Sequence, residues 1–545
     1  MNSGPVSLLG DLVAAAPDRV QLWDVVGGES LPVTRAELWQ RAGALRGDLA
    51  KHGVGRGDGV AVWLPNWSDA VVWQLATAAL GAHVIGVNTR YGTDDVAHVL
   101  ERARPKVLAI AHGFLRLDLA ARLAQAMAST DVSAPSVAVL TGPGAEPADE
   151  AARAAYDVGA GVWVPSPPAT GAPDPTALQD HPDELFVAFT TSGSTGRPKL
   201  AAHTARASAD HSLAVARVAD FDEDSVTLMV LPWSGVLAWN PGMAGLVAGG
   251  TLVMLPSFDE RALDLMGERG ITHLACADDV GGRLMREWQR RPRDLSAFRR
   301  FLIGDFYGES ERIATWVEEE TDATVVGIFG SSELFALTGL RTPADDLPRR
   351  HRPGGHVVLE GVEVRTVDPV TGESVTGVGE LQFRGPNVVD AYLGDTDGRQ
   401  AEAARTPDGW FRTGDLGLAP GDGTFDYHCR MGDSMRLKGF LVEPAEIEAR
   451  LVQHDAVERA KVVGLDTGGG TQAIAFVVPR AGARPDPQAL RTWCAESLAR
   501  FKVPAHIHVI DEMPMTAGAN GAKIRAATLR DMAKELANAG TEGEK

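Results

Sequence analysis

Short apolar runs alternate with helical periods over about the first 140 residues of the chain. The runs at residues 59–64, 83–87 and 106–110 have the length and composition of buried strands. Between and after them, apolar positions recur at helical spacing from Ser68 onward and again over residues 94–102. Strands that alternate with helices in this way predict a doubly wound α/β layer.

A second unit with the same alternation begins near residue 184. Its apolar runs lie at residues 225–231, 250–255 and 323–328. From about residue 354 to 430 the runs become shorter, and Gly, Pro and Asp turns become frequent. This change of pattern predicts a small β-barrel.

Together these patterns predict an α/β protein of two domains. The large N-terminal domain, residues 1–430, would contain two doubly wound α/β subdomains and the small β-barrel. A smaller, mobile α+β domain would follow over residues 431–545. Residues 141–183, rich in Gly, Pro, Ala and acidic residues, are typical of a surface excursion from the first domain.

The composition is that of a globular protein with an acidic surface. Of the 545 residues, 44% are hydrophobic and 23% are charged, and the net charge is −20. No basic block stands out, which disfavours binding to nucleic acid or to an anionic membrane. A chain of this length is also too long for one hydrophobic core.

Cysteine usage and the apolar segments predict a cytoplasmic protein. The three cysteines form no CxxC pair, which argues against a disulfide framework or a zinc site. The N-terminus lacks the basic region of a secretory signal. The longest apolar run, residues 71–87, is interrupted by Gln74 and His83 and is shorter than the roughly 20 residues of a membrane span.

A loop of hydroxyls and glycines follows the apolar run at residues 185–189. Glycines let backbone N–H groups turn toward an anion, hydroxyls add donors, and a lysine adds positive charge. A Walker loop has a different spacing, and here Leu200 follows the lysine in place of Ser or Thr. The pattern predicts phosphate binding of another type, with an ordinary flexible turn as the alternative. The candidate residues are Thr190, Thr191, Ser192, Gly193, Ser194, Thr195, Gly196 and Lys199.

Two strand ends carry carboxylates in settings that suit a nucleotide. In the first, Phe329 beside the opening at Gly330 would sandwich a purine, and Glu333 would ligate Mg²⁺. In the second, Asp415 follows Thr-Gly and would accept both hydroxyls of a ribose. Alone, the first motif is more often an ordinary strand-end turn, and the second is equally compatible with a turn aspartate.

Two basic segments lie in the last quarter of the chain. Arg430 opens a glycine-containing stretch that leads to a helix starting at Pro444, where proline and acidic residues favour the first turn. On its own this stretch is a linker followed by a helix. Lys523 comes just after a Gly-rich loop, a position at which a lone lysine is ordinarily solvated.

In this order, the five motifs resemble those of the acyl-adenylate-forming superfamily. That superfamily includes acyl-CoA synthetases, the adenylation domains of peptide synthetases, and firefly luciferase. The resemblance covers nearly the whole chain and extends to residues 64–66 and 86–91 near the N-terminus. It implies ATP, Mg²⁺ and coenzyme A as cofactors.

The resemblance also assigns a role to each motif in an adenylation step. The 190–199 loop would hold the β- and γ-phosphates of ATP, Phe329 would lie near adenine, and Asp415 with Arg430 would hold the ribose. The residues at the reacting centre would be Ser332 on the α-phosphate, Glu333 on Mg²⁺, and Lys523 between the substrate carboxylate and the α-phosphate. Lysine and Mg²⁺ would neutralise the charge that develops there.

A second half-reaction is implied for the C-terminal part. The C-terminal domain would rotate about a hinge at Gly432 and Asp433. Lys438, Gly439 and Phe440 would then line the pantetheine tunnel, and a thiolate would attack the acyl-adenylate.

The chain departs from the family pattern at four places. Lys199 is followed by Leu200 in place of glycine, and residues 232–235 read Pro-Trp-Ser-Gly in place of Pro-Leu-Phe-His. Gly432 stands where the hinge is usually Asp or Lys, and Lys523 is spaced Gly-Ala-Lys in place of Gly-Lys. These departures bear on whether adenylation is retained and on the shape of the acid pocket.

The resemblance predicts an ATP-dependent carboxylic acid–CoA ligase that releases AMP and pyrophosphate, as a monomer or a homodimer. A hydrophobic, bulky or cyclic acid would bind beside Trp233, Ser234, Gly235, Trp239, Asn240 and Thr338. One alternative transfers an acyl group from an adenylate made by a separate enzyme, and another loads a separate carrier protein. A luciferase-like oxidation and an inactive nucleotide sensor are further alternatives.

Overall fold

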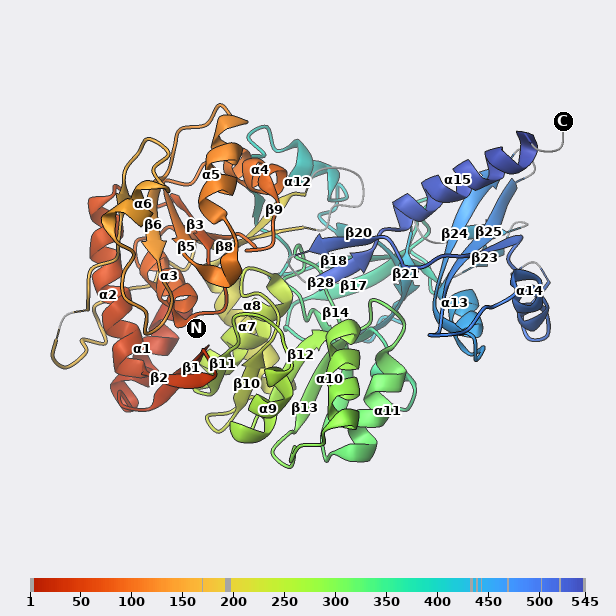
Figure 1. Cartoon of the computed structure of the whole chain (residues 1–545), viewed down its shortest axis with the longest axis horizontal. Helices are drawn as coiled ribbons and strands as arrows, with labels where there is room; N and C mark the ends of the chain where they lie inside the picture. The colour runs from red at the N-terminus through yellow and green to blue at the C-terminus, as the bar shows by residue number, and fades with distance from the viewer. Residues whose placement is uncertain are drawn as a thin grey trace.

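The computed structural model of the chain has a large body and a smaller one at its C-terminal end (Figure 1). It describes residues 4–168, 170–191, 198–431, 435–437, 440–442, 444–467, 470–500, 502–518 and 521–542. The large body is built on two large sheets and ends with β21 (Thr424–Arg430). The structure therefore confirms the α/β fold class.

The first sheet is mainly parallel and carries the first predicted unit. Its strands pair in the order β19 (Ala391–Tyr392), β9 (Leu200–Thr204), β8 (Leu185–Thr190), β4 (His83–Gly86), β3 (Gly59–Trp63), β5 (Val107–Ala111), β6 (Ser136–Leu140) and β7 (Val162–Trp163). Only the β19–β9 and β9–β8 pairs are antiparallel among the described pairings of this sheet. The 190–199 loop therefore joins an antiparallel hairpin at the sheet's carboxyl edge.

The second sheet has a parallel half and an antiparallel half. The parallel half runs from β14 (Thr324–Phe329) through β13 (Arg300–Gly304), β12 (His273–Ala277), β10 (Val226–Met229) and β11 (Thr251–Met254) to β1 (Val20–Val26), and β2 (Glu29–Thr34) is added antiparallel at the edge. The antiparallel half continues from β14 through β15 (Gly339–Leu340), β16 (Gly354–Val357), β21, β20 (Phe411–Leu418), β18 (Gly379–Arg384) and β17 (Glu363–Val367). The strands predicted as a barrel are thus antiparallel, and in the described pairings they extend the second sheet as one open row.

Helices cover and separate the two sheets. They are α1 (Pro5–Ala15), α2 (Arg35–Lys51), α3 (Ser68–Ala78), α4 (Thr93–Ala103), α5 (Leu119–Ala128), α6 (Glu150–Ala154), α7 (Ala205–Val218), α8 (Val236–Val247), α9 (Arg261–Glu268), α10 (Asp278–Arg290), α11 (Ser310–Glu320) and α12 (Arg399–Ala403). Every residue of α8 is buried, and its apolar character all round is typical of a central helix. At its N-terminus, α2 has a capping box between Thr34 and Glu37, which satisfies backbone N–H groups of the first turn.

The excursion at residues 141–183 is attached to the body by polar contacts near its end. The carboxylate of Asp180 accepts backbone N–H groups of Gly4 and Ser7 at 2.9 and 2.7 Å. The Trp39 indole N–H donates to the Asp174 carbonyl at 2.7 Å. The segment is therefore tied to the start of α1 and to Trp39 of α2.

The smaller body is an α+β unit with cores on both faces of its main sheet. Its elements are β22 (Met435–Leu437), β23 (Phe440–Val442), α13 (Pro444–Val452), β24 (Val457–Thr467), β25 (Gly470–Pro479), α14 (Pro487–Ala495), β26 (His506–Val509), β27 (Met515–Gly518), β28 (Gly521–Ile524) and α15 (Ala526–Glu542). Apolar residues of β24 and β25 pack against α13 and α14 on one face and α15 on the other. Arg459 of β24 lies over the Tyr307 ring of the large body, 5.6 Å from its centroid. In the described part of the chain, no helix combines the length and apolar character needed to cross a bilayer.

Candidate active site

The hairpin of β8 and β9 fixes both ends of the predicted phosphate loop. The Thr191 N–H donates to the Lys199 carbonyl at 2.8 Å, and the Lys199 N–H donates to the Thr191 hydroxyl at 3.1 Å. Tyr91 and Thr190 share a hydrogen bond between their hydroxyls. Ser192, Gly193, Ser194, Thr195 and Gly196 lie outside the described residues, so their phosphate contacts stay predictions.

The structure explains the leucine that departs from the family pattern. Leu200 pairs with Thr190 as the first residue of β9, and its side chain is fully buried. It therefore extends the strand and fills the core immediately beyond the loop. This use is compatible with a phosphate loop, because the loop's two ends are still held together.

Opposite charges meet around Glu333. Burial raises the pKa of the Glu333 carboxyl above its ordinary value, and the positive charges of Lys199 and Arg430 act to lower it. The Lys199 ammonium also lies over the Tyr392 ring, 4.7 Å from its centroid. The half-buried Glu333 carboxylate fits Mg²⁺, which binds through one or two carboxylates together with substrate phosphates, and the two cations would face those phosphates. Among the described residues, no group of three or more His, Cys, Asp and Glu forms a metal cage of its own.

The loop that carries Ser332 and Glu333, residues 332–336, is held through its backbone. The Ser332 carbonyl accepts from His203 of β9 at 2.7 Å, and the Ala336 carbonyl accepts from His211 of α7 at 2.9 Å. The other carbonyls of the loop accept from Val389 N–H at 2.7 Å, from Asn387 at 3.0 Å and Thr338 at 2.6 Å, and from Asn240 at 3.0 Å. Every carbonyl of the 332–336 loop is therefore bound by a donor outside that loop.

These anchors hold an unusual backbone conformation. Phe335, Ala336 and Leu337 have φ values of 62°, 50° and 35°, a left-handed region that costs non-glycine residues energy. A Cβ at Gly330 would lie 2.6 Å from the Ala336 Cα, so only glycine fits there. The anchors and the close approach at Gly330 together determine where the Glu333 side chain starts.

Asp415 and Arg430 are partners across two neighbouring strands. They pair directly in the register of β20 and β21, and the Arg430 guanidinium donates to the Asp415 carboxylate at 2.8 Å. The same nitrogen donates to the Thr413 carbonyl at 2.7 Å. Asp415 is buried, so this pair fixes its carboxylate at the edge that also carries Glu333.

Phe329 is more enclosed than an exposed adenine platform. Its ring is stacked on Phe383 with centroids 5.9 Å apart, and it meets Phe425 edge-on at 5.1 Å. Tyr427 lies against it at 5.4 Å. Its contact with adenine stays a prediction, and the structure adds a role in joining β14 to the antiparallel half of the sheet.

The predicted acid-pocket residues divide into two groups. Trp233, Ser234 and Trp239 border an enclosed cavity of about 10 Å³ with Phe189 and Gln74, and Gly235 caps the N-terminus of α8. The side chains of Asn240 and Thr338 instead bind the 332–336 loop, as described above. In this structure the cavity has room for about one water molecule, so a bulky acid requires these walls to move.

Several predictions fall on residues whose side chains the structure does not describe. Gly432, Asp433, Lys438 and Gly439 lie outside the described residues. Phe440 begins β23, and Lys523 pairs with Thr516 in β27–β28, but the structure describes only their backbone. The hinge, tunnel and lysine assignments therefore stay predictions.

The sequence analysis did not identify the residues that anchor the 332–336 loop. His203 and His211 are fully buried, stack with the Phe335 ring at 4.2 and 5.4 Å, and have pKa values that burial lowers to about 4. A single histidine on an apolar strand or helix gives no distinguishing pattern. Their role as anchors is visible only in the structure, where both rings bind carbonyls of the same loop.

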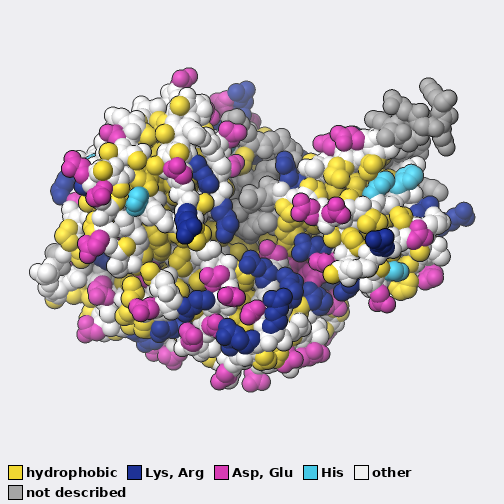
Figure 2. Space-filling view, viewed as in Figure 1, with side chains coloured by type: hydrophobic (Ala, Val, Ile, Leu, Met, Phe, Trp, Pro, Cys, Tyr) yellow, Lys and Arg dark blue, Asp and Glu magenta, His cyan; other side chains and the backbone are white. Residues whose placement is uncertain are grey.

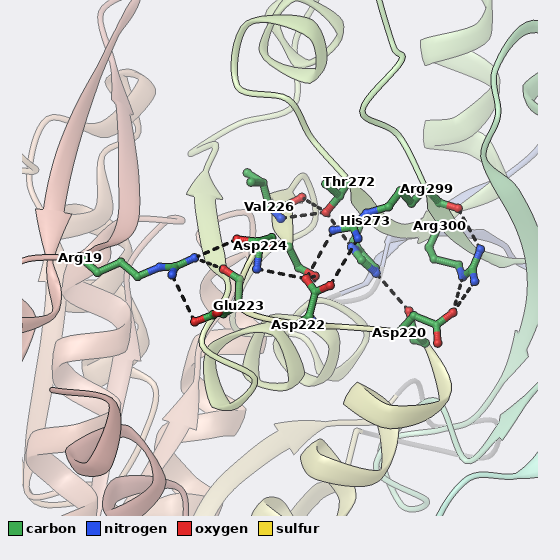
Figure 3. Close-up of polar contacts among 12 residues, drawn as sticks. Arg19, Asp220, Asp222, Glu223, Asp224, Val226, Thr272, His273, Arg299 and Arg300 are labelled. Atoms are coloured by element: carbon green, nitrogen blue, oxygen red, sulfur yellow. Dashed lines mark hydrogen bonds and ion pairs between the residues drawn. The ribbon is translucent and has the colours of Figure 1, made fainter. Parts of the chain in front are cut away.

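The other end of the second sheet carries a different kind of polar cluster. At the amino edge, Figure 3 shows Arg19, Arg299 and Arg300 directed at carboxylates of the segment before β10. Arg19 lies 3.3 Å from Glu223 and Arg299 lies 3.4 Å from Asp222. This cluster belongs to no candidate site, because its charges satisfy one another.

Comparison with known proteins supports one assignment for the whole chain. A family model described as AMP-binding enzyme matches residues 11–393, and one described as AMP-binding enzyme C-terminal domain matches residues 446–520. The chain is 31% identical to a methyl-dioxo-octahydro-indenyl propanoyl:CoA ligase of Mycobacterium tuberculosis, covering 94% of this chain and 96% of the other. It is 31% identical to a 2-hydroxy-7-methoxy-5-methyl-1-naphthoate–CoA ligase of Streptomyces carzinostaticus, covering 88% and 86%. The crystal structure of ATP-bound MatB from Rhodopseudomonas palustris superposes with a TM-score of 0.80 at 25% identity, over 97% and 99% of the two chains.

Proposed function

The chain belongs to the family of AMP-binding enzymes, and we propose that it joins a ring-bearing carboxylic acid to CoA in two steps. The observation that carries this proposal is the meeting of Lys199, Glu333 and the Asp415–Arg430 pair at one edge of the large body. These are the groups that a nucleotide triphosphate with its metal requires. The relatives named above support CoA as the acceptor.

In the first step, a carboxylate oxygen of the acid attacks the α-phosphorus of ATP. The bond from that phosphorus to the bridging oxygen of the β-phosphate breaks, and pyrophosphate leaves. Lys199 would compensate phosphate charge, and Asp415 would accept the ribose hydroxyls. Glu333 would hold Mg²⁺, which would supply Lewis-acid stabilisation there. Ser332 and Lys523 are assigned to the α-phosphate.

In the second step, the CoA thiolate attacks the carbonyl carbon of the acyl-adenylate. The bond from that carbon to the AMP oxygen breaks, so AMP leaves and a thioester forms. The thiol proton is lost to solvent before attack. Gly439 and its neighbours are assigned to the pantetheine arm by resemblance alone.

A ring-bearing acid fits the walls of the small cavity. Trp233 and Trp239 supply aromatic surface. Gly235, next to the lining residue Ser234, stands where the family pattern has a larger side chain. The two relatives above are named for acids with fused rings. Because the cavity measures about 10 Å³, we expect Trp233 to move when the acid binds.

Pyrophosphate exchange into ATP tests the proposal. Purified protein is given Mg²⁺, ATP, labelled pyrophosphate and a panel of fused-ring, aromatic and straight-chain acids, with and without CoA. The proposal expects acid-dependent exchange without CoA and the fastest exchange with ring-bearing acids. Thioester formation from a supplied acyl-adenylate without any exchange would indicate the transfer-only alternative, and product formed only on a holo carrier protein would indicate the carrier-loading alternative.

A further inference from the structure

The enclosed cavity of about 10 Å³ is bordered by strands β3, β4 and β8 of the first sheet and by helices α3 and α8. The strands contribute only apolar residues to its lining. One of them is Phe189 of β8, and the 190–199 loop begins at the next residue. The cavity therefore lies beside the loop assigned to the phosphates, where the proposed function places the acid.

The lining of the cavity carries no charge. Among the residues that the structure describes, those that border the cavity are all apolar or neutral, whereas charged side chains are spread over the molecular surface (Figure 2). A carboxylate buried here would have no cation to compensate it. The carboxyl group of the acid would therefore point out of the cavity, and the cavity would receive the remote end of the acid.

Two polar side chains of the lining are already paired within the protein. The Gln74 amide group donates to the Phe186 carbonyl at 2.9 Å. The side-chain oxygen of Gln74 accepts the indole N–H of Trp239 at 3.3 Å. Neither Gln74 nor Trp239 therefore needs a ligand to satisfy its polar atoms.

The other two polar side chains of the lining, Trp233 and Ser234, are buried without a partner. Trp233 is 5% exposed and Ser234 is 7% exposed. Even so, the Trp233 Nε1 and the Ser234 Oγ form no hydrogen bond with any described residue. Buried polar groups nearly always have a partner, and a donor left unpaired costs free energy. Consecutive residues of one cavity wall thus offer two hydrogen bonds to whatever occupies it.

The turn that carries these two donors is fixed through its backbone. The Asn66 side chain accepts the Trp233 backbone N–H at 2.7 Å and donates to two carbonyls of residues 229–231 at 2.9 and 2.8 Å. A Cβ on Gly86 would lie 2.6 Å from the Ser234 carbonyl oxygen, so β4 packs directly against the turn. The movement expected of Trp233 when the acid binds would therefore be a rotation of its side chain alone.

The two unpaired groups define the chemistry of the atom that they would bind. An indole N–H only donates, whereas a serine hydroxyl donates or accepts. Their common partner must therefore accept a hydrogen bond from Trp233, and it would be neutral because no cation lines the cavity. A ketone or hydroxyl oxygen meets both conditions. It would make the same hydrogen bonds as a buried water, for which a cavity of this size has room.

We propose that Trp233 and Ser234 bind a ketone or hydroxyl oxygen on the ring end of the acid, and that they select acids with such an oxygen over acids without one. The inference rests on the proposed function for the placement of the acid. It concerns two residues at which the chain departs from the family pattern Pro-Leu-Phe-His.

Binding of matched acids to the full chain tests the inference without catalysis. The probes are decalin carboxylic acid and two derivatives that carry a ketone or a hydroxyl on the ring remote from the carboxyl group. Calorimetry should give an affinity about tenfold higher for each oxygenated acid than for the plain acid, because two neutral hydrogen bonds are gained. Equal affinities, or no binding of the oxygenated acids, would overturn the inference and leave the two donors to a buried water.

Variants that remove one donor at a time locate the preference. Trp233→Phe and Ser234→Ala should each lower the ratio of the two affinities about threefold, and the combined variant should show no preference. The matched controls are Trp316→Phe and Ser212→Ala, whose Nε1 and Oγ are also buried without a partner among the described residues but lie outside this lining. They should keep the full preference. An unchanged preference in the combined variant, or an equal loss in the controls, would contradict the inference.

An infrared spectrum of the bound keto acid reports on the hydrogen bonds themselves. The stretching frequency of its ring carbonyl should be lower in the wild-type chain than in either Trp233→Phe or Ser234→Ala, because each donor polarises the carbonyl. The same frequency in all three proteins would overturn the inference.

Pyrophosphate exchange with the same acids separates this inference from the proposed function. Selective binding of the oxygenated acids without any exchange would retain the inference and contradict the proposed function. Exchange with equal kcat/KM for the oxygenated and plain acids would do the reverse.

Discussion

The two edges of the second sheet treat charge in opposite ways. At the amino edge, Arg299 and Arg300 reach the carboxylates of Asp222 and Asp220, and Arg19 reaches Glu223 (Figure 3). At the carboxyl edge, Glu333 lies in the fields of Lys199 and Arg430. Arg430 is paired with Asp415, whereas neither Lys199 nor Glu333 forms an ion pair among the described residues.

This contrast distinguishes structural charge from binding charge. Paired charges at the amino edge satisfy one another and connect loops to strands, which contributes little net stability at an exposed site. Charges without partners cost energy in the free protein, and a ligand of opposite charge recovers it. Buried donors hold in place the backbone that carries a binding charge. His203 and His211 do this for the loop that carries Glu333.

The largest expected effect comes from removing charge at the carboxyl edge. Glu333→Gln keeps the shape of the side chain but removes the charge assigned to Mg²⁺, so pyrophosphate exchange should fall by about 100–1,000-fold. The matched control is Glu223→Gln at the amino edge, which should exchange at the wild-type rate. Equal rates in both variants would remove the distinction between the edges.

The next largest effect is a loss of stability at low pH, where the buried anchors His203 and His211 become protonated. The pKa values of His203 and His211 are lowered to about 4, from about 6.5 in an unfolded chain, so the unfolded state binds protons more tightly. Their contribution is therefore complete above pH 6.5 and is lost as the pH falls toward 4. At pH 5 the loss should be on the order of 1–2 kcal/mol for each histidine.

Denaturant unfolding at pH 7 and pH 5 measures this loss. Asp24 acts in the opposite direction, because burial raises its pKa to about 6 and its protonation favours the folded state. His211→Asn keeps an amide donor without a titrating group, so the stability of this variant should fall less between the two pH values. An unchanged pH dependence would show that His211 is not the neutral anchor described above.

A smaller effect should follow from removing one anchor. His203→Phe keeps an aromatic ring against Phe335 but leaves the Ser332 carbonyl without its donor, which should cost about 1–3 kcal/mol of stability. Because Ser332 and Glu333 shift together, the kcat of exchange should fall about tenfold with little change in the KM for ATP. His203→Gln, which restores a donor, should recover part of the kcat; lost stability with an unchanged kcat would limit His203 to a structural role.

The smallest effect is expected at the amino edge itself. Arg299→Gln removes an exposed pair with Asp222, so the free energy of unfolding should change by about 0–1 kcal/mol. Neither exchange nor thioester formation should change. A large loss of activity in this variant would mean that the amino edge affects the site.

Much of the large body could be predicted from the sequence, because its strands are continuous apolar runs. The run at residues 106–110 is β5 with a shift of one residue, and the helix expected over residues 94–102 is α4. The parallel strand order required the three-dimensional structure. So did the extension of the second sheet by the antiparallel strands, since nothing in a short strand specifies its neighbour.

The charged residues of the candidate site could be predicted from the sequence, because they belong to recognisable motifs. Lys199, Glu333, Asp415 and Arg430 were all expected, and the structure brings them to one edge. Asn240 and Thr338 were expected at the acid pocket, yet their polar atoms bind the 332–336 loop. A neutral donor leaves no pattern along the chain, because its partner is a backbone carbonyl distant in sequence.

Trapping the intermediate tests the central claim most directly. The protein is mixed with Mg²⁺, ATP and a ring-bearing acid that supports exchange, quenched without CoA, and examined by mass spectrometry; a second sample receives CoA before quenching. The account predicts acyl-AMP in stoichiometric amount in the first sample and its conversion to acyl-CoA in the second. Acyl-CoA formed in the second sample with no acyl-AMP in the first, at any time point, would contradict it.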